Sequence, residues 1–363
     1  MKKIITIIAL VVILFSCKEN QPTELDGNNE IQIVALWKNY SLDSLQSYAP
    51  LVNSEVVFVS EYGTLTETTD ENGILILKDI PSAIYQISVR GLHPDDNSIQ
   101  IVGNITDVEV KSGNTLIDTI IAKPISASGI SINEIYSGGP VNSFFFCFDQ
   151  FIELYNSSDK VKYLDGIQVF RFSGTDGGTK GPGSDWGLDG DVDGITYAFK
   201  FPGKAGEQNY PFKPNSFLVL ASDAYDHRNT VSTSIDLSNA DWEFVNQFNA
   251  VDIDNPNVPN LETFQLDDTH DFLLRTYNDI VIIASGADTV WQDGIDFETV
   301  LDGVEYQKSI NFIVTLDDRI DRGWILNPPI YSGESMQRRD KGVDTNNGTL
   351  DWETIPLPTP GWQ

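Results

Sequence analysis

The feature that most constrains this chain is a series of short apolar segments separated by turn-forming residues. Residues 85–89 and 106–110 alternate apolar and polar side chains, which is typical of a half-buried strand. Residues 280–284 are continuously apolar, which is typical of a strand buried on both faces. The 28 Gly and 17 Pro are spread among such segments, and this favours strands joined by many turns. The sequence therefore predicts an all-β fold, and 363 residues suffice for two consecutive β-sandwich domains.

The N-terminus has the layout of a secretory signal peptide. Two lysines precede a stretch at residues 4–15 that is apolar except for Thr6, and this stretch is too short to span a bilayer as a mature helix. The sequence Leu14-Phe15-Ser16-Cys17 follows, and it resembles the lipobox of bacterial lipoproteins. The resemblance implies a signal peptide at residues 1–16 and acylation of Cys17, whose several acyl chains together would anchor the protein stably. The alternative is an ordinary secretory signal with a chance cysteine.

The residues that follow the cleavage position indicate the location of the protein in the cell. Residues 17–30 are polar, which predicts a lipid-anchored tether rather than a folded segment. Lys18, not Asp, follows Cys17, and this resembles lipoproteins that are released to the outer membrane. The resemblance implies a lipid-anchored protein of the outer membrane that faces either the periplasm or the cell surface.

The charge of the chain limits its partners. A net charge of -30 repels nucleic acid phosphates, so the sequence predicts no nucleic acid binding through a basic surface. Strong acidity suits either simple solubility or the coordination of hard cations by carboxylates. Both interpretations stay open at this point.

The second cysteine, Cys147, has no partner for an intramolecular disulfide once Cys17 is acylated. It lies within an aromatic run at residues 144–148. We expect this run to be strand core and Cys147 to be a small buried side chain.

Residues 31–123 contain two turns with a recognisable order. A Thr-Asp-Glu-Asn-Gly turn at residues 69–73 precedes one apolar segment, and an Ile-Pro-Ser-Ala-Ile-Tyr turn at residues 80–85 leads into the next. This order resembles the carboxypeptidase regulatory-like, transthyretin-like β-sandwich, although Ala83 stands where that family usually has Gly. The resemblance implies a spacer or scaffold module without peptidase activity.

Residues 130–363 carry five pieces that resemble the lamin-tail domain, an immunoglobulin-like β-sandwich. The pieces are residues 132–156, 213–223, 279–284, 301–306 and the closing residues 335–361. Two long insertions, residues 171–204 and 225–268, enlarge the sandwich, and long loops on a compact domain often carry function. The whole chain resembles an uncharacterised Bacteroidota-type outer-membrane lipoprotein family.

The first insertion contains a candidate metal site. Asp189, Asp191 and Asp193 precede Gly194, and alternate carboxylates in a tight turn can converge on calcium. Lys200 stands where an EF-hand needs its Glu, so the pattern favours a looser calcium loop or, alternatively, a solvated acidic loop. Trp186 is flanked by Asp and Gly, and it is predicted either to stack on a sugar or another flat ligand or to serve the core.

Catalytic motifs are missing from the sequence. His93, His227 and His270 form no His-Glu-x-x-His motif, and there is no Gly-x-Ser-x-Gly elbow. We therefore predict a non-enzymatic, lipid-anchored outer-membrane binding or scaffold protein, accessory to nutrient uptake or surface assembly, with an outer-membrane protein or a glycan as partner. The alternative is a surface hydrolase that uses the acidic insertion loops.

Overall fold

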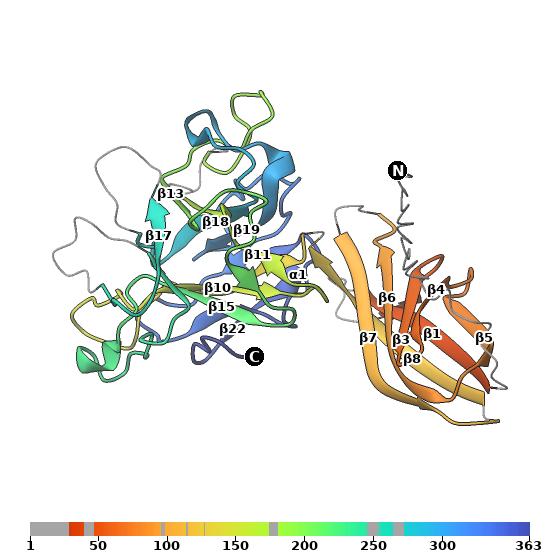
Figure 1. Cartoon of the computed structure of the whole chain (residues 1–363). Coiled ribbons are helices and arrows are strands. Elements are labelled where there is room, and N and C mark those ends of the chain that lie inside the picture. Colours follow the sequence, from red (N-terminus) through yellow and green to blue (C-terminus); the bar gives the residue numbers. More distant parts are fainter. Residues whose placement is uncertain are drawn as a thin grey trace, which may run out of the picture.

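The computed structural model describes residues 29–39, 47–95, 99–113, 115–126, 128–173, 181–244, 254–263 and 272–363. Within these ranges the fold is all-β, as predicted, and the strands form two groups that follow one another along the chain (Figure 1). Residues 29–30, which were expected to end the tether, already belong to the first strand. The predicted signal peptide and Cys17 lie outside the described residues.

The first group is one eight-stranded system that is shown in red to yellow in Figure 1. Strand β8 joins its two parts, because it pairs in parallel with β1 and antiparallel with β7. The strands run in the order β2-β1-β8-β7-β6-β3-β4, with β5 also paired to β1. They are β1 (Asn29–Asn39), β2 (Ser47–Pro50), β3 (Glu55–Ser60), β4 (Gly63–Thr68), β5 (Ile74–Ile80), β6 (Ala83–Leu92), β7 (Ile99–Val110) and β8 (Thr115–Ser126).

Alternation in the sequence builds the core of this group. Along β1 every second residue is buried, and Ile31, Ile33 and Ala35 are fully covered. The predicted turn before β5 is also present: an oxygen of Asp70 accepts hydrogen bonds from the backbone N–H groups of residues 72 and 74. Gly73 closes the turn with φ +72°, and a Cβ there would lie 2.6 Å from the Ala35 carbonyl oxygen, so only Gly fits.

The second group contains the remaining strands and four short helices. The strands are β9 (Ile130–Tyr136), β10 (Phe151–Asn156), β11 (Lys162–Tyr163), β12 (Gln168–Phe172), β13 (Tyr197–Lys200), β14 (Pro211–Phe212), β15 (Phe217–Ala221), β16 (Trp242–Phe244), β17 (Asn260–Thr263), β18 (Asn278–Ala284), β19 (Val300–Gln307), β20 (Ile325–Leu326), β21 (Ser335–Arg338) and β22 (Trp352–Ile355). The helices are η1 (His227–Asn229), η2 (Trp291–Asp293), η3 (Phe297–Thr299) and α1 (Gly348–Asp351).

Twelve of these strands form one path, in two halves that face each other across a core. One half has the order β20-β19-β18-β12-β13-β17, and the other continues as β16-β15-β10-β9-β21-β22. The parallel pair β16–β17 joins the halves on one side. On the other side the two end strands β20 and β22 lie beside each other, and the Thr354 hydroxyl donates a 3.4 Å hydrogen bond to the Leu326 carbonyl. We call this second meeting place the seam.

The two sequence regions expected as insertions take part in this sheet. Residues 171–204 contain β13, and residues 225–268 contain η1, β16 and β17. Because β16 and β17 are the strands that join the two halves, residues 225–268 form part of the sheet and are not only a surface insertion.

The aromatic run at residues 144–148 is not the strand core that the sequence predicts. It lies in the loop between β9 and β10, with Phe144 59% and Phe145 74% exposed. The side chain of Asn142 explains the difference, because it exchanges hydrogen bonds with the backbone at Pro140, Phe144 and Phe146. These local bonds satisfy backbone groups that a strand would pair with a neighbour. Cys147 in the same loop is half-buried.

Two buried carboxylates hold the C-terminal segment against β9 and β10. Glu134 accepts hydrogen bonds from the backbone N–H and the hydroxyl of Thr359, and Glu153 accepts one of 2.6 Å from the N–H of Gly361. Burial raises the pKa of both side chains, that of Glu153 to about 8, and the neighbouring charge of Glu134 adds to the effect. The fold therefore favours a protonated Glu153 near neutral pH.

Ion pairs connect the two strand groups. Lys38 and Lys123 both face Asp340, at 2.7 and 3.7 Å, and Arg90 pairs with Asp159 at 2.6 Å. These ion pairs are partly exposed, so each contributes little to stability on its own.

Candidate functional site

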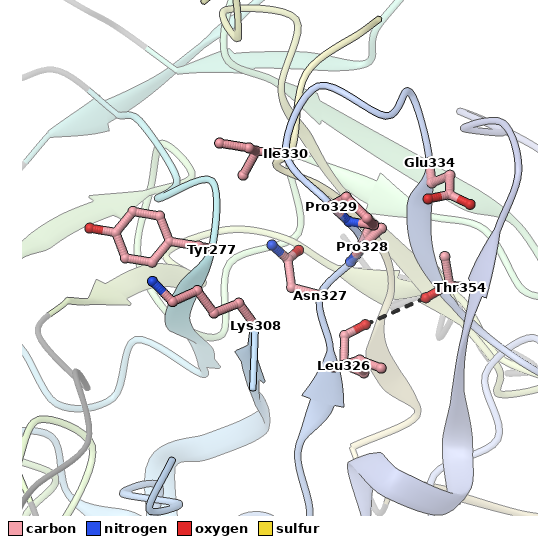
Figure 2. Close-up of a pocket in the computed structure, with 9 residues that line it drawn as sticks. All are labelled: Tyr277, Lys308, Leu326, Asn327, Pro328, Pro329, Ile330, Glu334 and Thr354. Carbon is pink, nitrogen blue, oxygen red and sulfur yellow. Dashed lines mark hydrogen bonds between the residues drawn. The ribbon is translucent and has the colours of Figure 1, made fainter. Parts of the chain in front are cut away.

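A pocket of about 670 Å³ lies at the seam (Figure 2). We call it the seam pocket. Its walls come from the ends of several strands: Leu326 lies on β20, Thr354 on β22, Lys308 directly after β19 and Tyr277 directly before β18. The remaining lining residues are Asn327, Pro328, Pro329, Ile330 and Glu334.

The sequence after β20 explains why the seam stays open. Pro328 and Pro329 have no backbone N–H and a fixed φ, so β20 cannot extend towards β22 as a paired strand. The preceding Asn327 is buried, with its backbone N–H bonded to Gln307 at 2.8 Å and its side chain bonded to Thr276 at 2.7 Å. These two hydrogen bonds of Asn327 hold the turn in place, so the pocket is formed without a ligand.

The surface of the pocket is mainly apolar. Leu326 and Ile330 are half-exposed, at 51% and 47%, and the two proline rings lie between them in sequence. Apolar surface held open in a concavity is the usual setting for a ligand, since burying it from water is favourable.

Two opposite charges flank this apolar surface. Figure 2 shows Lys308 beside Tyr277 on one side of the pocket and Glu334 on the other side. The ammonium of Lys308 lies 4.4 Å from the centre of the Tyr277 ring. Among the described residues, no carboxylate pairs with Lys308 and no cation pairs with Glu334. Both charges are free to meet a ligand.

Strained aromatic residues border the pocket. Tyr331, which follows the lining residue Ile330, has φ +58°, and its ring lies 5.8 Å from that of Phe145, whose φ is +67°. The left-handed region is uncommon for bulky side chains and costs free energy. Backbone hydrogen bonds hold the two loops together, from Tyr331 to Gly138 at 2.8 Å and from Gly333 to Gly139 at 3.1 Å.

The predicted acidic site is only partly assembled in the structure. Carboxylate oxygens of Asp185, Asp189 and Asp193 lie within 4.8 Å of one another. Asp191 instead faces Asp296. The loop thus brings together two of the three predicted ligands and adds Asp185, which the alternating spacing did not single out.

Hydrogen bonds already engage much of this acidic group. An oxygen of Asp193 accepts bonds of 2.8 and 2.9 Å from the N–H groups of Trp186 and Gly187. Asp185 pairs with Arg319 at 3.0 Å, and this bond lowers the pKa of Asp185. Calcium binding at Asp189 and its neighbours stays a prediction. The ion pair with Arg319 already neutralises the negative charge of Asp185.

Asp191 has a separate environment. Loss of contact with water, a shared hydrogen bond with Asp296 and charge repulsion from Asp296 together raise the pKa of Asp191 to about 6. Nearby Trp186 is 56% exposed, so its ring is accessible, and its role in stacking on a flat ligand stays a prediction.

The two described histidines are engaged in local contacts. His227 is buried, and its Nε2 lies 3.1 Å from the carbonyl oxygen of Asp223. The adjacent Asp226 pairs with Arg228 instead, at 2.7 Å. His93 packs against the Trp37 ring. In the described part of the chain, neither ring is hydrogen-bonded to a hydroxyl or a thiol, and His270 lies outside it.

Sequence reasoning missed the seam pocket. Its lining comes from residues 277 to 354, which gather only when the sheet folds back on itself. The one local signal was the Asn327-Pro328-Pro329 sequence, which ends a strand. No helix in the described ranges is long and apolar enough to cross a membrane.

Comparison with known proteins agrees with the expected Bacteroidota-type family. A profile of the family described as "Protein of unknown function (DUF4876)" matches residues 213–293, which include Tyr277 of the seam pocket. No curated protein matches the chain. The resemblances to the lamin-tail and carboxypeptidase regulatory-like domains stay predictions.

Solved structures show what the fold is similar to. A proposed carbohydrate binding protein from Pseudomonas aeruginosa matches with a TM-score of 0.21 and 14% identity, over 27% of this chain and 91% of that chain. Another, from Bacteroides uniformis, matches with a TM-score of 0.20 and 13% identity, over 74% of this chain and 94% of that chain. Both are too weakly similar to carry an argument. The crystal structure of a DUF4876 family protein from Bacteroides thetaiotaomicron is similar over 89% of this chain and 94% of that chain, with a TM-score of 0.59 and 20% identity. The chain therefore shares its fold with a DUF4876 family protein of Bacteroides.

Proposed function

We propose that this chain is a non-enzymatic binding protein of the cell envelope that holds its ligand in the seam pocket. The observation that carries the proposal is a preformed, mainly apolar cavity of about 670 Å³ flanked by an uncommitted lysine and an uncommitted glutamate. Ligand sites are usually concave and apolar, with a few polar groups that fix orientation. The seam pocket has these properties, and its Asn327 floor is fixed before any ligand arrives.

An occluding substitution tests this proposal. Leu326→Trp would fill the pocket with a larger side chain, while Leu357→Trp is a matched control, because Leu357 is 70% exposed and does not line the pocket. Thermal shifts of both variants and the original chain would be recorded against panels of oligosaccharides, short peptides and fatty acids. We expect one class to raise the melting temperature of the original chain and the control but not of Leu326→Trp. If no class does so, the proposal is wrong.

The proposed location in the cell envelope rests on the N-terminal sequence. A lipobox-like sequence ending in Cys17 supports a lipid anchor at the outer membrane, where a binding protein would serve nutrient uptake or surface assembly. Cell fractionation of the original chain and of Cys17→Ser checks this point. The original should sediment with outer membranes and the variant should be soluble. Equal distribution of the two would contradict the anchor, and protease treatment of intact cells distinguishes the periplasmic from the surface-exposed face.

The second candidate is a surface hydrolase, and Asp191 is the observation that favours it. A carboxyl with a pKa of about 6 that is hydrogen-bonded to Asp296 has the character of a general acid or base. The purified chain would be incubated with glycan, ester and phosphodiester panels, alongside Asp191→Asn. Turnover that Asp191→Asn abolishes would establish the hydrolase. Inactivity across the panels would leave binding as the function.

A further inference from the structure

We propose that the ligand of the seam pocket is a short peptide with free termini and an apolar middle, bound as a zwitterion between Lys308 and Glu334. This inference rests on the proposed function and names its ligand class. It starts from the charges of the pocket, because Lys308 and Glu334 lie on opposite sides of an apolar surface and neither is paired within the described residues (Figure 2).

The polar side chains of Asn327 and Thr354, which also line the pocket, already form hydrogen bonds within the protein. Asn327 donates to the Thr276 carbonyl at 2.7 Å and accepts from the Ser137 hydroxyl at 3.3 Å. The Thr354 hydroxyl donates to the Leu326 carbonyl. Besides the hydroxyl of Tyr277, the polar side chains that remain available to a ligand are therefore the cation Lys308 at one side and the anion Glu334 at the other.

A neutral sugar fits this arrangement poorly. Sugars need a stacking ring and several hydrogen-bonding groups, but the one aromatic side chain that lines the pocket, Tyr277, has the Lys308 ammonium 4.4 Å from its ring centre. A sugar would also leave the charges of Lys308 and Glu334 uncompensated. The lining instead offers prolines, Leu326 and Ile330, which are suited to an aliphatic side chain.

A short peptide complements every one of these features. Its carboxylate would lie at Lys308, its ammonium at Glu334, and a central aliphatic side chain would cover Leu326 and the proline rings. Complementary charges also fix the direction of the peptide and reject molecules of the wrong polarity. The pocket volume of about 670 Å³ lies within the range of small-ligand sites.

Calorimetric titration of the full chain with Ala-Leu-Ala tests the inference. The same peptide would be used in N-acetylated, C-amidated and doubly capped forms. We expect each cap to weaken binding by about fivefold, as for an ion pair at a partly exposed site. Lys308→Gln should lose the response to C-amidation only, and Glu334→Gln the response to N-acetylation only. Lys160→Gln and Glu67→Gln are matched controls, because both residues are exposed and neither lines the pocket.

The outcomes separate the ligand class from the function. Equal binding of free and capped peptides would overturn the zwitterion. Failure of all four peptides, together with binding of an oligosaccharide that Leu326→Trp abolishes, would overturn the peptide class and leave the binding function intact. Failure of every ligand class to respond to Leu326→Trp would overturn both.

Discussion

The two halves of the twelve-stranded sheet meet at two places, and these are built differently. At the first, β16 and β17 pair through their backbones, with Phe244 opposite Leu261, and Phe244 stacks on Phe272 with ring centres 3.6 Å apart. At the second, the seam, the proline pair after β20 prevents pairing and a side-chain hydrogen bond from Thr354 is what connects the edges. Backbone pairing and aromatic packing close one side, whereas no backbone pairing joins β20 to β22 among the described residues, and this leaves room for a ligand.

The largest expected effect is on the closed side. Phe244 is fully buried, and Phe244→Ala would leave a cavity among aromatic rings, so we expect a loss of about 3–5 kcal/mol in the free energy of unfolding. Ile330→Ala at the seam removes a half-exposed side chain and should cost about 0.5 kcal/mol. Urea denaturation measures both. Equal losses would mean that the two sides do not differ as described.

The second effect concerns pH and the half of the sheet that contains β9 and β10. Burial raises the pKa of Glu153 from its ordinary 4.5 to about 8. Between these values the unfolded chain releases a proton that the folded chain keeps, so stability falls as pH rises. We expect the free energy of unfolding to drop by at most about 1.4 kcal/mol for each pH unit within this window.

Glu153→Gln provides the check on this pH effect. An amide cannot ionise, so denaturation of the variant at about pH 5 and about pH 8 should show a smaller difference than the original chain. An unchanged difference would assign the pH dependence to other buried carboxyls. Asp149, whose pKa burial raises to about 6, would be the next residue to replace.

The smallest effect belongs to the acidic loop. Calcium at a concentration equal to its Kd would add about 0.4 kcal/mol of stability. Asp189→Asn should remove this gain, because Asp189 faces Asp185 and Asp193, whereas Asp191→Asn should keep it. Melting curves with calcium and with chelator measure the gain. Identical curves for metal-free protein would show that the loop is solvated acidic surface.

Local patterns predicted the strands well because each strand carries its own signal. The alternation of β1 and the turn at Asp70 to Gly73 are properties of consecutive residues. The seam has no such signal, since β20 has two residues and meets β22 only through the whole path of the sheet. Sequence composition could not reveal that Asn142 would turn the aromatic run into an exposed loop.

In the acidic loop, the sequence pattern also failed to predict the direction of one side chain, that of Asp191. Its sequence suggested that alternate aspartates point to one centre, as they would in a regular turn. The loop is irregular, with Leu188 and Gly190 both at positive φ, so Asp191 faces Asp296 and Asp185 takes its place beside Asp189. Side-chain direction in irregular backbone depends on φ values that spacing alone does not encode.

Hydrogen exchange with and without Ala-Leu-Ala tests the difference between the two meeting places most directly. If the seam is the binding side, the peptide should slow amide exchange in residues 326–334 and 352–355 and leave β16 and β17 unchanged. Leu326→Trp should show no such protection. Protection that appears in the acidic loop or along β16 and β17, with the seam unchanged, would contradict the account.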